Sequence, residues 1–285
     1  MITWIASYPK SGSTWFRLLL ETLTQTEHAP IAINTLKRVA GHAASRAFFE
    51  EFSGVRAADL PRDLVDRIRP RVYDAAAQSM PGLQCVKVHD AWSHVAVSQP
   101  LFPRSATAGV VYVVRNPLDV AVSLRFHLSV DQDAAIGFMA NSLATLAASS
   151  RRLPEQLPQR LRRWADHVAS WLMESQLRVH LVRYEDLKAQ PLETLHGAAM
   201  FLGIPTDEIR IREAFASTAF ERLQAQEAVG GFRERHRHTG VFFRRGESGA
   251  WRDELSDTQV ARVVSDHAPM MRQLGYLDAA GELLC

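Results

Sequence analysis

A short loop near the amino terminus combines the residue types that bind phosphate-like anions. Residues 8–15 read Tyr-Pro-Lys-Ser-Gly-Ser-Thr-Trp and follow a short apolar run. Gly12 lets the backbone approach an anion closely, and the amides that follow can point at it from the start of a helix. The loop also carries hydroxyl donors and one cation, namely Ser11, Ser13, Thr14 and Lys10. It lacks the spacing of a Walker A loop, and a plain helix N-cap is the alternative interpretation.

A second segment places an arginine at the end of an apolar run. Residues 111–123 read Val-Tyr-Val-Val-Arg-Asn-Pro-Leu-Asp-Val-Ala-Val-Ser. Asn116 is a favourable N-cap and Pro117 suits the first helical position, so Arg115 should leave the carboxyl end of a strand. Its guanidinium can grip a phosphate through two parallel hydrogen bonds, and Ser123 lies two helical turns further on. From the residues alone, a structural ion pair is an equally good interpretation of the arginine.

A basic segment further along the chain is a third candidate anion site. Residues 243–252 read Phe-Arg-Arg-Gly-Glu-Ser-Gly-Ala-Trp-Arg, with Arg244 and Arg245 directly before Gly246. Clustered arginines allow local anion binding. Taken alone, such a loop more commonly forms a solvated surface.

A histidine at another predicted strand end is the candidate general base. His89 directly follows the apolar run 83–88, with Lys87 two residues earlier. A histidine near its ordinary pKa can accept a proton from an attacking hydroxyl. Asp90 follows at once, and the sequence leaves open whether it orients the imidazole or serves as a turn residue.

Two further histidines raise the question of a metal site. His236 and His238 lie within residues 230–245, which are rich in glycine and arginine and predict a loop. The interleaved arginines would repel a cation, and no carboxylate or thiol spacing supports a metal site. We therefore predict no metal, and the loop is either a lid over an anionic ligand or a plain surface loop.

Strands and helices that alternate along the chain are expected to position these residues. Strands are predicted at residues 2–7, 83–88, 109–114 and 179–184. Helices are predicted at residues 14–23, 154–175, 192–202 and 207–216, and a capping box of Ser256 and Gln259 opens a last helix towards Leu274. The expected fold is α/β, a doubly wound central parallel sheet flanked by helices, with a P-loop-like loop after the first strand. Ligands in such folds bind beyond the carboxyl ends of the strands.

Composition narrows the function classes. Lys and Arg number 33 and Asp and Glu 31, and a formal charge of +2 argues against a nucleic-acid binder. Cys85 and Cys285 are too sparse for a disulfide framework or zinc site. Met1–Ile5 does not read as a signal peptide, and no apolar run approaches the roughly 18 residues that span a bilayer. We expect one domain over 1–285, in the cytoplasm.

The three anion-site segments together resemble the PAPS-dependent sulfotransferases, in their cytosolic-type, bacterial-like single-domain form. Residues 8–15 are similar to the family's Y-P-K-[SA]-G-[ST]-[TH]-W, and residues 115–123 to its R-[ND]-P-x-D-x-x-x-S. Residues 244–251 are similar to its R-K-G-x-x-G-x-W, with Arg245 for the lysine and Ala250 before the tryptophan. The resemblance implies 3′-phosphoadenosine 5′-phosphosulfate (PAPS) as sulfate donor and 3′-phosphoadenosine 5′-phosphate (PAP) as product.

The resemblance also implies roles for the matching residues. Lys10 and the loop after it would hold the 5′-phosphosulfate, Arg115 and Ser123 the 3′-phosphate, and the segment at 244–246 would close over that phosphate. Tyr184, in a stretch similar to [RF]-Y-E-D-[LM], would contact the adenine. The implied cofactor-binding residues are Lys10, Ser11, Gly12, Ser13, Thr14, Trp15, Arg115, Ser123, Tyr184, Thr218, Phe220, Arg244, Arg245 and Gly246.

The implied chemistry is direct in-line transfer of the sulfuryl group to a hydroxyl or amine. Residues 86–89 resemble the family's K-[TS]-H, so His89 would be the general base, and Lys10 would stabilise the leaving phosphate. Two alternatives stay open: a nucleotide-dependent kinase on a related fold, and a non-catalytic PAP- or PAPS-binding module.

The sequence does not identify the acceptor. Residues 28–80 and 125–160 match no motif, and a small molecule, glycolipid or saccharide is expected. The phenylalanines in these stretches either line an apolar pocket or pack in the core, and they are Phe48, Phe49, Phe52, Phe126 and Phe138. Whether the chain forms a homo-oligomer is likewise open.

Overall fold

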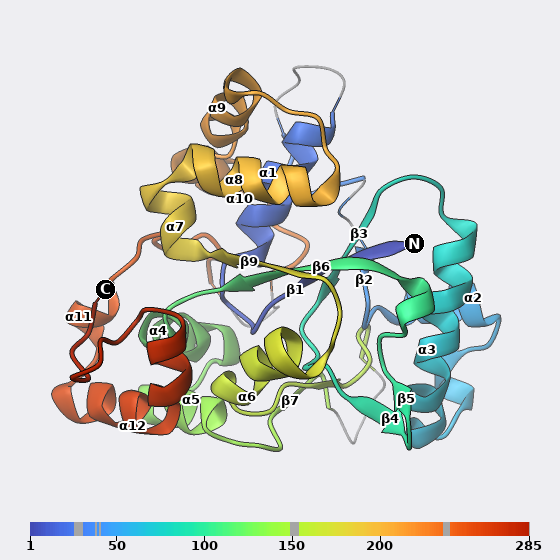
Figure 1. The fold of residues 1–285 in the computed structure, drawn as a ribbon, viewed down its shortest axis with the longest axis horizontal. Helices are drawn as coiled ribbons and strands as arrows, with labels where there is room; N and C mark the ends of the chain where they lie inside the picture. Colours follow the sequence, from blue (N-terminus) through green and yellow to red (C-terminus); the bar gives the residue numbers. More distant parts are fainter. Residues whose placement is uncertain (26–30, 38, 40, 149–153, 236–239, 285) are drawn as a thin grey trace.

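A computed structural model of the chain describes residues 1–25, 31–37, 39, 41–148, 154–235 and 240–284 (Figure 1). Within these residues, five parallel strands form the central sheet in the order β2-β3-β1-β6-β9. The strands are β1 (Ile2–Ala6), β2 (Gly41–His42), β3 (Gln84–Val88), β6 (Thr107–Val114) and β9 (Val179–Arg183). The doubly wound α/β prediction is confirmed.

Side chains that alternate along the strands pack into two hydrophobic cores, one on each face of the sheet. Ile5 and Val111 pack against α1 (Ser13–Thr24), α8 (Pro191–Leu202) and α9 (Glu208–Ser217), which lie above the sheet in Figure 1. Trp4 and Tyr112 face the other side, with α3 (Arg62–Ser79), α4 (Pro117–Leu128), α6 (Trp164–Ala169) and α12 (Asp257–Gln273). Burial on both faces explains why these strands read as continuous apolar runs.

Shorter elements complete the chain. The remaining helices are α2 (Arg46–Ser53), α5 (Gln132–Met139), α7 (Tyr184–Ala189), α10 (Phe220–Gly230) and α11 (Trp251–Glu254). The 3-10 helices η1 (Ala57–Asp59) and η2 (Arg104–Ala106) and the π-helical turn η3 (Ser170–Glu174) join them. Two small hairpins pair β4 (His94–Ala96) with β5 (Gln99–Pro100) and β7 (Thr145–Leu146) with β8 (Gln159–Arg160).

The prediction of one helix over 154–175 is wrong in its first half. Helix α6 begins only at Trp164, and Gln159–Arg160 form strand β8. Pro154 and Pro158 disfavour helix there, and Arg162 has a positive φ of 61° that ends any regular element. The apolar residues have helical spacing because Leu157 and Leu161 of this segment are buried in the same hydrophobic core as Trp164 of α6.

The other expected elements are present, with small shifts at their ends. The four predicted strands match β1, β3, β6 and β9, and Ser256 with Gln259 forms the predicted capping box of α12. Strand β2 is only two residues long, which is too short to show the apolar run from which the other strands were predicted. After Gly230 the described residues up to 245 form no regular element, as the loop prediction required.

Candidate active site

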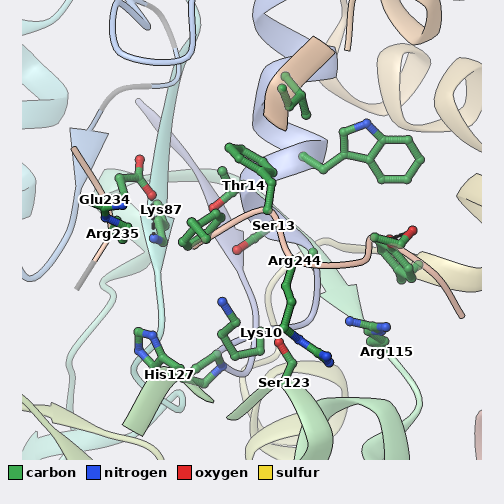
Figure 2. Close-up of a pocket in the computed structure, with 18 of the residues that line it drawn as sticks. Lys10, Ser13, Thr14, Lys87, Arg115, Ser123, His127, Glu234, Arg235 and Arg244 are labelled. Carbon is green, nitrogen blue, oxygen red and sulfur yellow. Dashed lines mark hydrogen bonds and ion pairs between the residues drawn. The ribbon is translucent and has the colours of Figure 1, made fainter. Parts of the chain in front are cut away.

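A large cleft lies where the sheet's carboxyl edge meets the loops that follow the strands. Its volume is about 1290 Å³, and Figure 2 shows part of its lining. It brings together the residues after β1, β3 and β6, the start of α7 and two segments from the carboxyl-terminal third. His89 and every predicted cofactor-binding residue except Ser11 line it.

The loop after β1 turns through two left-handed residues. Lys10 has φ 71° and Gly12 φ 93°. A Cβ at Gly12 would lie 2.4 Å from the ring of Tyr184, so only glycine fits there. Gly12 is also the N-cap of α1, and no side chain caps that end. No side chain caps the first amides of α1, and Ser13 and Thr14 line the cleft, so this helix start lacks the side-chain cap of an ordinary N-cap and suits an anion.

Positive charge concentrates around this loop. Burial and the nearby cations Lys87, Arg115 and Arg244 lower the pKa of Lys10 to about 8. Two buried polar atoms beside the cleft, Ser11 Oγ and Arg115 Nε, have no hydrogen-bond partner. Unpaired donors together with mutually repelling cations match the chemistry of an anionic ligand such as a phosphate.

The lowered pKa of Lys10 makes anion affinity depend on pH. A bound anion favours the charged amine and raises this pKa, so binding is strongest while Lys10 is protonated and weakens above about pH 8. We expect calorimetry to show PAP affinity falling by up to about tenfold per pH unit between pH 8 and 9.5. Lys10→Arg stays charged and should remove this pH dependence, whereas an unchanged slope in that variant would contradict the assignment.

His89 is held in one tautomer. Its Nδ1 lies 2.8 Å from the Ser7 carbonyl oxygen and 3.3 Å from Ser7 Oγ. A carbonyl oxygen can only accept, so Nδ1 carries the hydrogen and Nε2 of the neutral ring has a free lone pair. Burial, followed by the nearby Lys87 and His42, holds the pKa of His89 well below its ordinary value. The ring is therefore neutral at pH 7 and can accept a proton at Nε2, although burial makes it a weaker base than a histidine at its ordinary pKa.

Asp90 does not contact the imidazole of His89. Its carboxylate forms a buried ion pair with Arg69, with atoms 2.6 Å and 3.1 Å apart, and accepts from the Arg160 amide. Asp90 therefore anchors the segment after β3 to α3.

Glu234 is a cleft residue that the sequence did not reveal. Its carboxylate lies 2.9 Å from Lys87 Nζ and 2.7 Å from an Arg17 nitrogen. Burial alone would raise the pKa of Glu234, but these two cations outweigh it and hold the pKa well below its ordinary value. The contact ties the loop after α10 to β3 and α1. The only hint in the sequence is that Glu234 is an acidic residue within an arginine-rich segment.

Arg115 lies at the end of β6, as predicted. Its guanidinium stacks 4.6 Å from the centre of the Tyr184 ring and contacts the Glu247 carbonyl oxygen. Asp119 is 3.6 Å away. Figure 2 shows Arg115, Ser123 and Arg244 around the same part of the cleft as Lys10.

Asp119 has a structural role that the sequence did not indicate. Its two carboxylate oxygens accept hydrogen bonds from the backbone N–H groups of Gly249, at 2.8 Å, and Trp251, at 3.2 Å. The side chain is almost fully buried. Asp119 therefore fastens the segment that contains Arg244 and Arg245 to the first turn of α4.

We expect Asp119→Ala to loosen this segment. Removing a buried carboxylate that accepts two backbone hydrogen bonds should lower the free energy of unfolding by about 2 to 3 kcal/mol. PAP affinity should fall about tenfold, because the guanidinium groups lose their fixed position. Denaturant titration and calorimetry measure the two effects, and Asp133→Ala, at an exposed site on α5, is the control. Equal results for both variants would contradict the role.

Aromatic side chains form the wall expected to face the adenosine. Trp15 Nε1 donates to the carbonyl and hydroxyl oxygens of Thr218, at 3.2 Å and 3.3 Å. The Tyr184 hydroxyl donates to the Gly246 carbonyl oxygen at 2.9 Å. A Cβ at Gly246 would lie 2.3 Å from the Phe220 ring, so the chain passes this ring as closely as glycine allows.

The two arginines before Gly246 share a carboxylate. Arg244 and Arg245 lie 3.0 Å and 3.2 Å from the same Glu254 oxygen, and Arg244 also stacks on Phe126. Both remain partly exposed to the cleft.

Two sequence hypotheses concern residues elsewhere. None of the five phenylalanines considered for an apolar pocket is among the described residues that line the cleft, and Phe49 lies in the core. His236 and His238 lie outside the described residues. Over the described part of the chain, no group of three or more His, Cys, Asp or Glu is arranged to hold a metal ion. Nor is any helix there long and apolar enough to cross a membrane.

The fold and cleft define an α/β protein with a cleft rich in cations at the carboxyl edge of a parallel sheet. The family model described as "Sulfotransferase domain" matches residues 2–275, so the chain belongs to the sulfotransferase domain family and is a sulfotransferase enzyme.

Individual relatives agree with this. Mouse sulfotransferase 2B1 is 28% identical over 54% of this chain and 45% of its own length. Cytosolic sulfotransferase 13 of Arabidopsis thaliana is 25% identical over 88% of this chain and 71% of its own. Among solved structures, retinol dehydratase in complex with androsterone and the inactive cofactor PAP has a TM-score of 0.61 at 19% identity. The match covers 95% of this chain and 80% of retinol dehydratase. At 19% identity this similarity supports the fold alone.

Proposed function

We propose that this enzyme transfers the sulfuryl group of PAPS directly, in line, to a hydroxyl or amine of an acceptor. The observation that carries the proposal is one cleft in which a neutral histidine and the uncapped, cation-rich loop after β1 occur together. PAPS supplies an electrophilic sulfuryl group and a phosphate leaving group. The neighbour's PAP complex is a property of that protein, and we extend its nucleotide to this chain as part of the proposal.

The proposed roles follow from the contacts of each residue. His89 takes the acceptor's proton at Nε2, while Ser7 holds Nδ1 and stabilises the imidazolium that forms. Lys10 and the first amides of α1 stabilise negative charge on the departing phosphate. Arg115, with Ser123, Arg244, Arg245 and the Gly246 backbone, holds the 3′-phosphate. The adenine lies by the aromatic wall.

The acceptor side of the cleft favours a polar small molecule or saccharide. It is lined mainly by side chains that hydrogen-bond: His42, Ser45, His127, Ser129, Glu155 and Gln156. Leu128 and Leu146 add limited apolar surface. Cytoplasmic location is proposed from the relatives named as cytosolic.

Calorimetry with PAP and ATP, followed by turnover of PAPS, tests the function. We expect micromolar or tighter PAP binding, weak ATP binding, and PAP release from PAPS that p-nitrophenol or a saccharide accelerates. Tight ATP binding with phosphoryl transfer would favour a kinase. Tight PAP binding without any PAPS turnover would leave a non-catalytic binding module.

A further inference from the structure

A buried chain of hydrogen bonds begins at the backbone of His89. His167 on α6 is fully buried and does not line the cleft, and its Nε2 lies 3.0 Å from the His89 carbonyl oxygen. That oxygen can only accept, so Nε2 of His167 carries a hydrogen. Burial lowers the pKa of His167 to about 4, so the ring is neutral and its Nδ1 accepts from the Tyr112 hydroxyl at 2.7 Å.

The His167 ring also contacts the loop that carries Lys10. The Tyr8 ring meets the His167 ring edge-on, with centroids 5.4 Å apart. Tyr8 is the first residue of the loop and is itself fully buried. One imidazole therefore contacts both the proposed donor-binding loop and the residue proposed as base.

Neighbouring side chains of the same helical stretch hold the residues after His89. Trp171 Nε1 donates to the Asp90 carbonyl oxygen at 3.0 Å, and Ser170 Oγ accepts from the Trp92 amide at 3.0 Å. Ser170 in turn donates to the His167 carbonyl oxygen at 2.7 Å. These contacts occur where α6 passes into the π-helical turn η3, and such turns often occur at functional sites.

We propose that His167, oriented by Tyr112, is a positioning residue that fixes the His89 backbone relative to the loop at 8–15. The inference rests on the proposed function, in which His89 is the base. Two hydrogen bonds then set the imidazole: its own Nδ1 on Ser7, and its backbone carbonyl on His167. Displacing a catalytic group by about 1 Å can cost about 100-fold in rate, so loss of the second bond should reduce turnover without removing the base.

The test compares His167→Leu with His167→Gln and with His267→Leu. A glutamine amide can donate where Nε2–H does, so it should restore part of the activity. His267 is the matched control: it is buried, its pKa is lowered to about 4, and it packs on Trp164 rather than on His89. The readouts are PAP affinity by calorimetry, and kcat and KM for sulfation of p-nitrophenol and for PAPS hydrolysis by water.

We expect His167→Leu to lower kcat by about 30- to 100-fold with PAP affinity changed less than about threefold, and His167→Gln to recover about tenfold. In a His89→Ala background, His167→Leu should have no further effect. Equal losses in the His167→Leu and His267→Leu variants, or an undiminished effect without His89, would overturn the inference. Tyr112→Phe, expected to lower kcat about fivefold, keeps the test decisive if His167→Leu does not fold. Wild-type turnover by His89→Ala would instead overturn the proposed base.

Discussion

His89→Ala is expected to lower kcat for sulfuryl transfer about a thousandfold, within the range of about 10² to 10⁴ that a general base contributes. The variant loses the one neutral imidazole whose Nδ1 is fixed on Ser7 and whose Nε2 is free for the acceptor's proton. PAP affinity should change less than about threefold, because the residues proposed to bind PAP lie on other elements. Turnover of PAPS with p-nitrophenol and calorimetry with PAP separate the two effects.

The pH dependence of the wild type gives a second readout of this base. Burial keeps the pKa of His89 below its ordinary value, so the base is already neutral through pH 6 to 8. The titration of His89 should therefore leave kcat constant between pH 6 and 8. It should lower kcat only at more acidic pH, where the imidazole becomes protonated. His196→Ala, at an exposed position of α8, is the control and should match the wild type. A His89→Ala rate within a factor of ten of the wild type would refute the assignment.

Arg115→Ala is expected to weaken PAP binding about 100-fold, since a pair of charge-assisted hydrogen bonds contributes roughly 3 kcal/mol. If Arg115 holds the 3′-phosphate, the loss should be specific to that group. Wild-type protein should then bind PAP much more tightly than adenosine 5′-monophosphate, and this difference in affinity should be about 100-fold smaller in the variant. Calorimetry with the two nucleotides makes the comparison.

Two control variants sharpen the Arg115 experiment. Arg115→Lys keeps the charge but not the planar fork, so it should recover only part of the affinity. Arg212→Ala removes a guanidinium from an exposed ion pair on α9 and should change neither affinity. Equal weakening of both nucleotides by Arg115→Ala would mean that the arginine supports the cleft generally, for instance through its stacking on Tyr184.

Local signals in the sequence determined much of this protein. The glycine of the first loop, the Asn-Pro helix start after Arg115 and the capping box of α12 each act within a few residues, so their structural consequences can be read directly. Continuous apolar runs likewise predicted four of the five strands. The candidate residues at the ends of those strands converge on one cleft because parallel strands share a carboxyl edge.

The error over residues 154–163 has a related cause. Leu157 and Leu161 are buried, so the apolar spacing correctly predicted which residues are buried, although not the secondary structure. An extended segment that crosses a core can bury every fourth residue, as a helix does. Only Pro154 and Pro158 indicated that this segment is not helical.

The remaining site features depend on tertiary structure. Glu234 reaches Lys87 across 147 residues, Asp119 accepts from the Trp251 amide across 132, and His167 reaches the His89 carbonyl across 78. No local pattern encodes such contacts, because each partner's own segment would be equally stable without the other. They form only when the folded sheet and its helices bring buried polar groups together, and the cost of leaving such groups unpaired then requires a partner. The sequence thus determined which residues stand at the strand ends, and the packing of distant elements decided how their side chains are held.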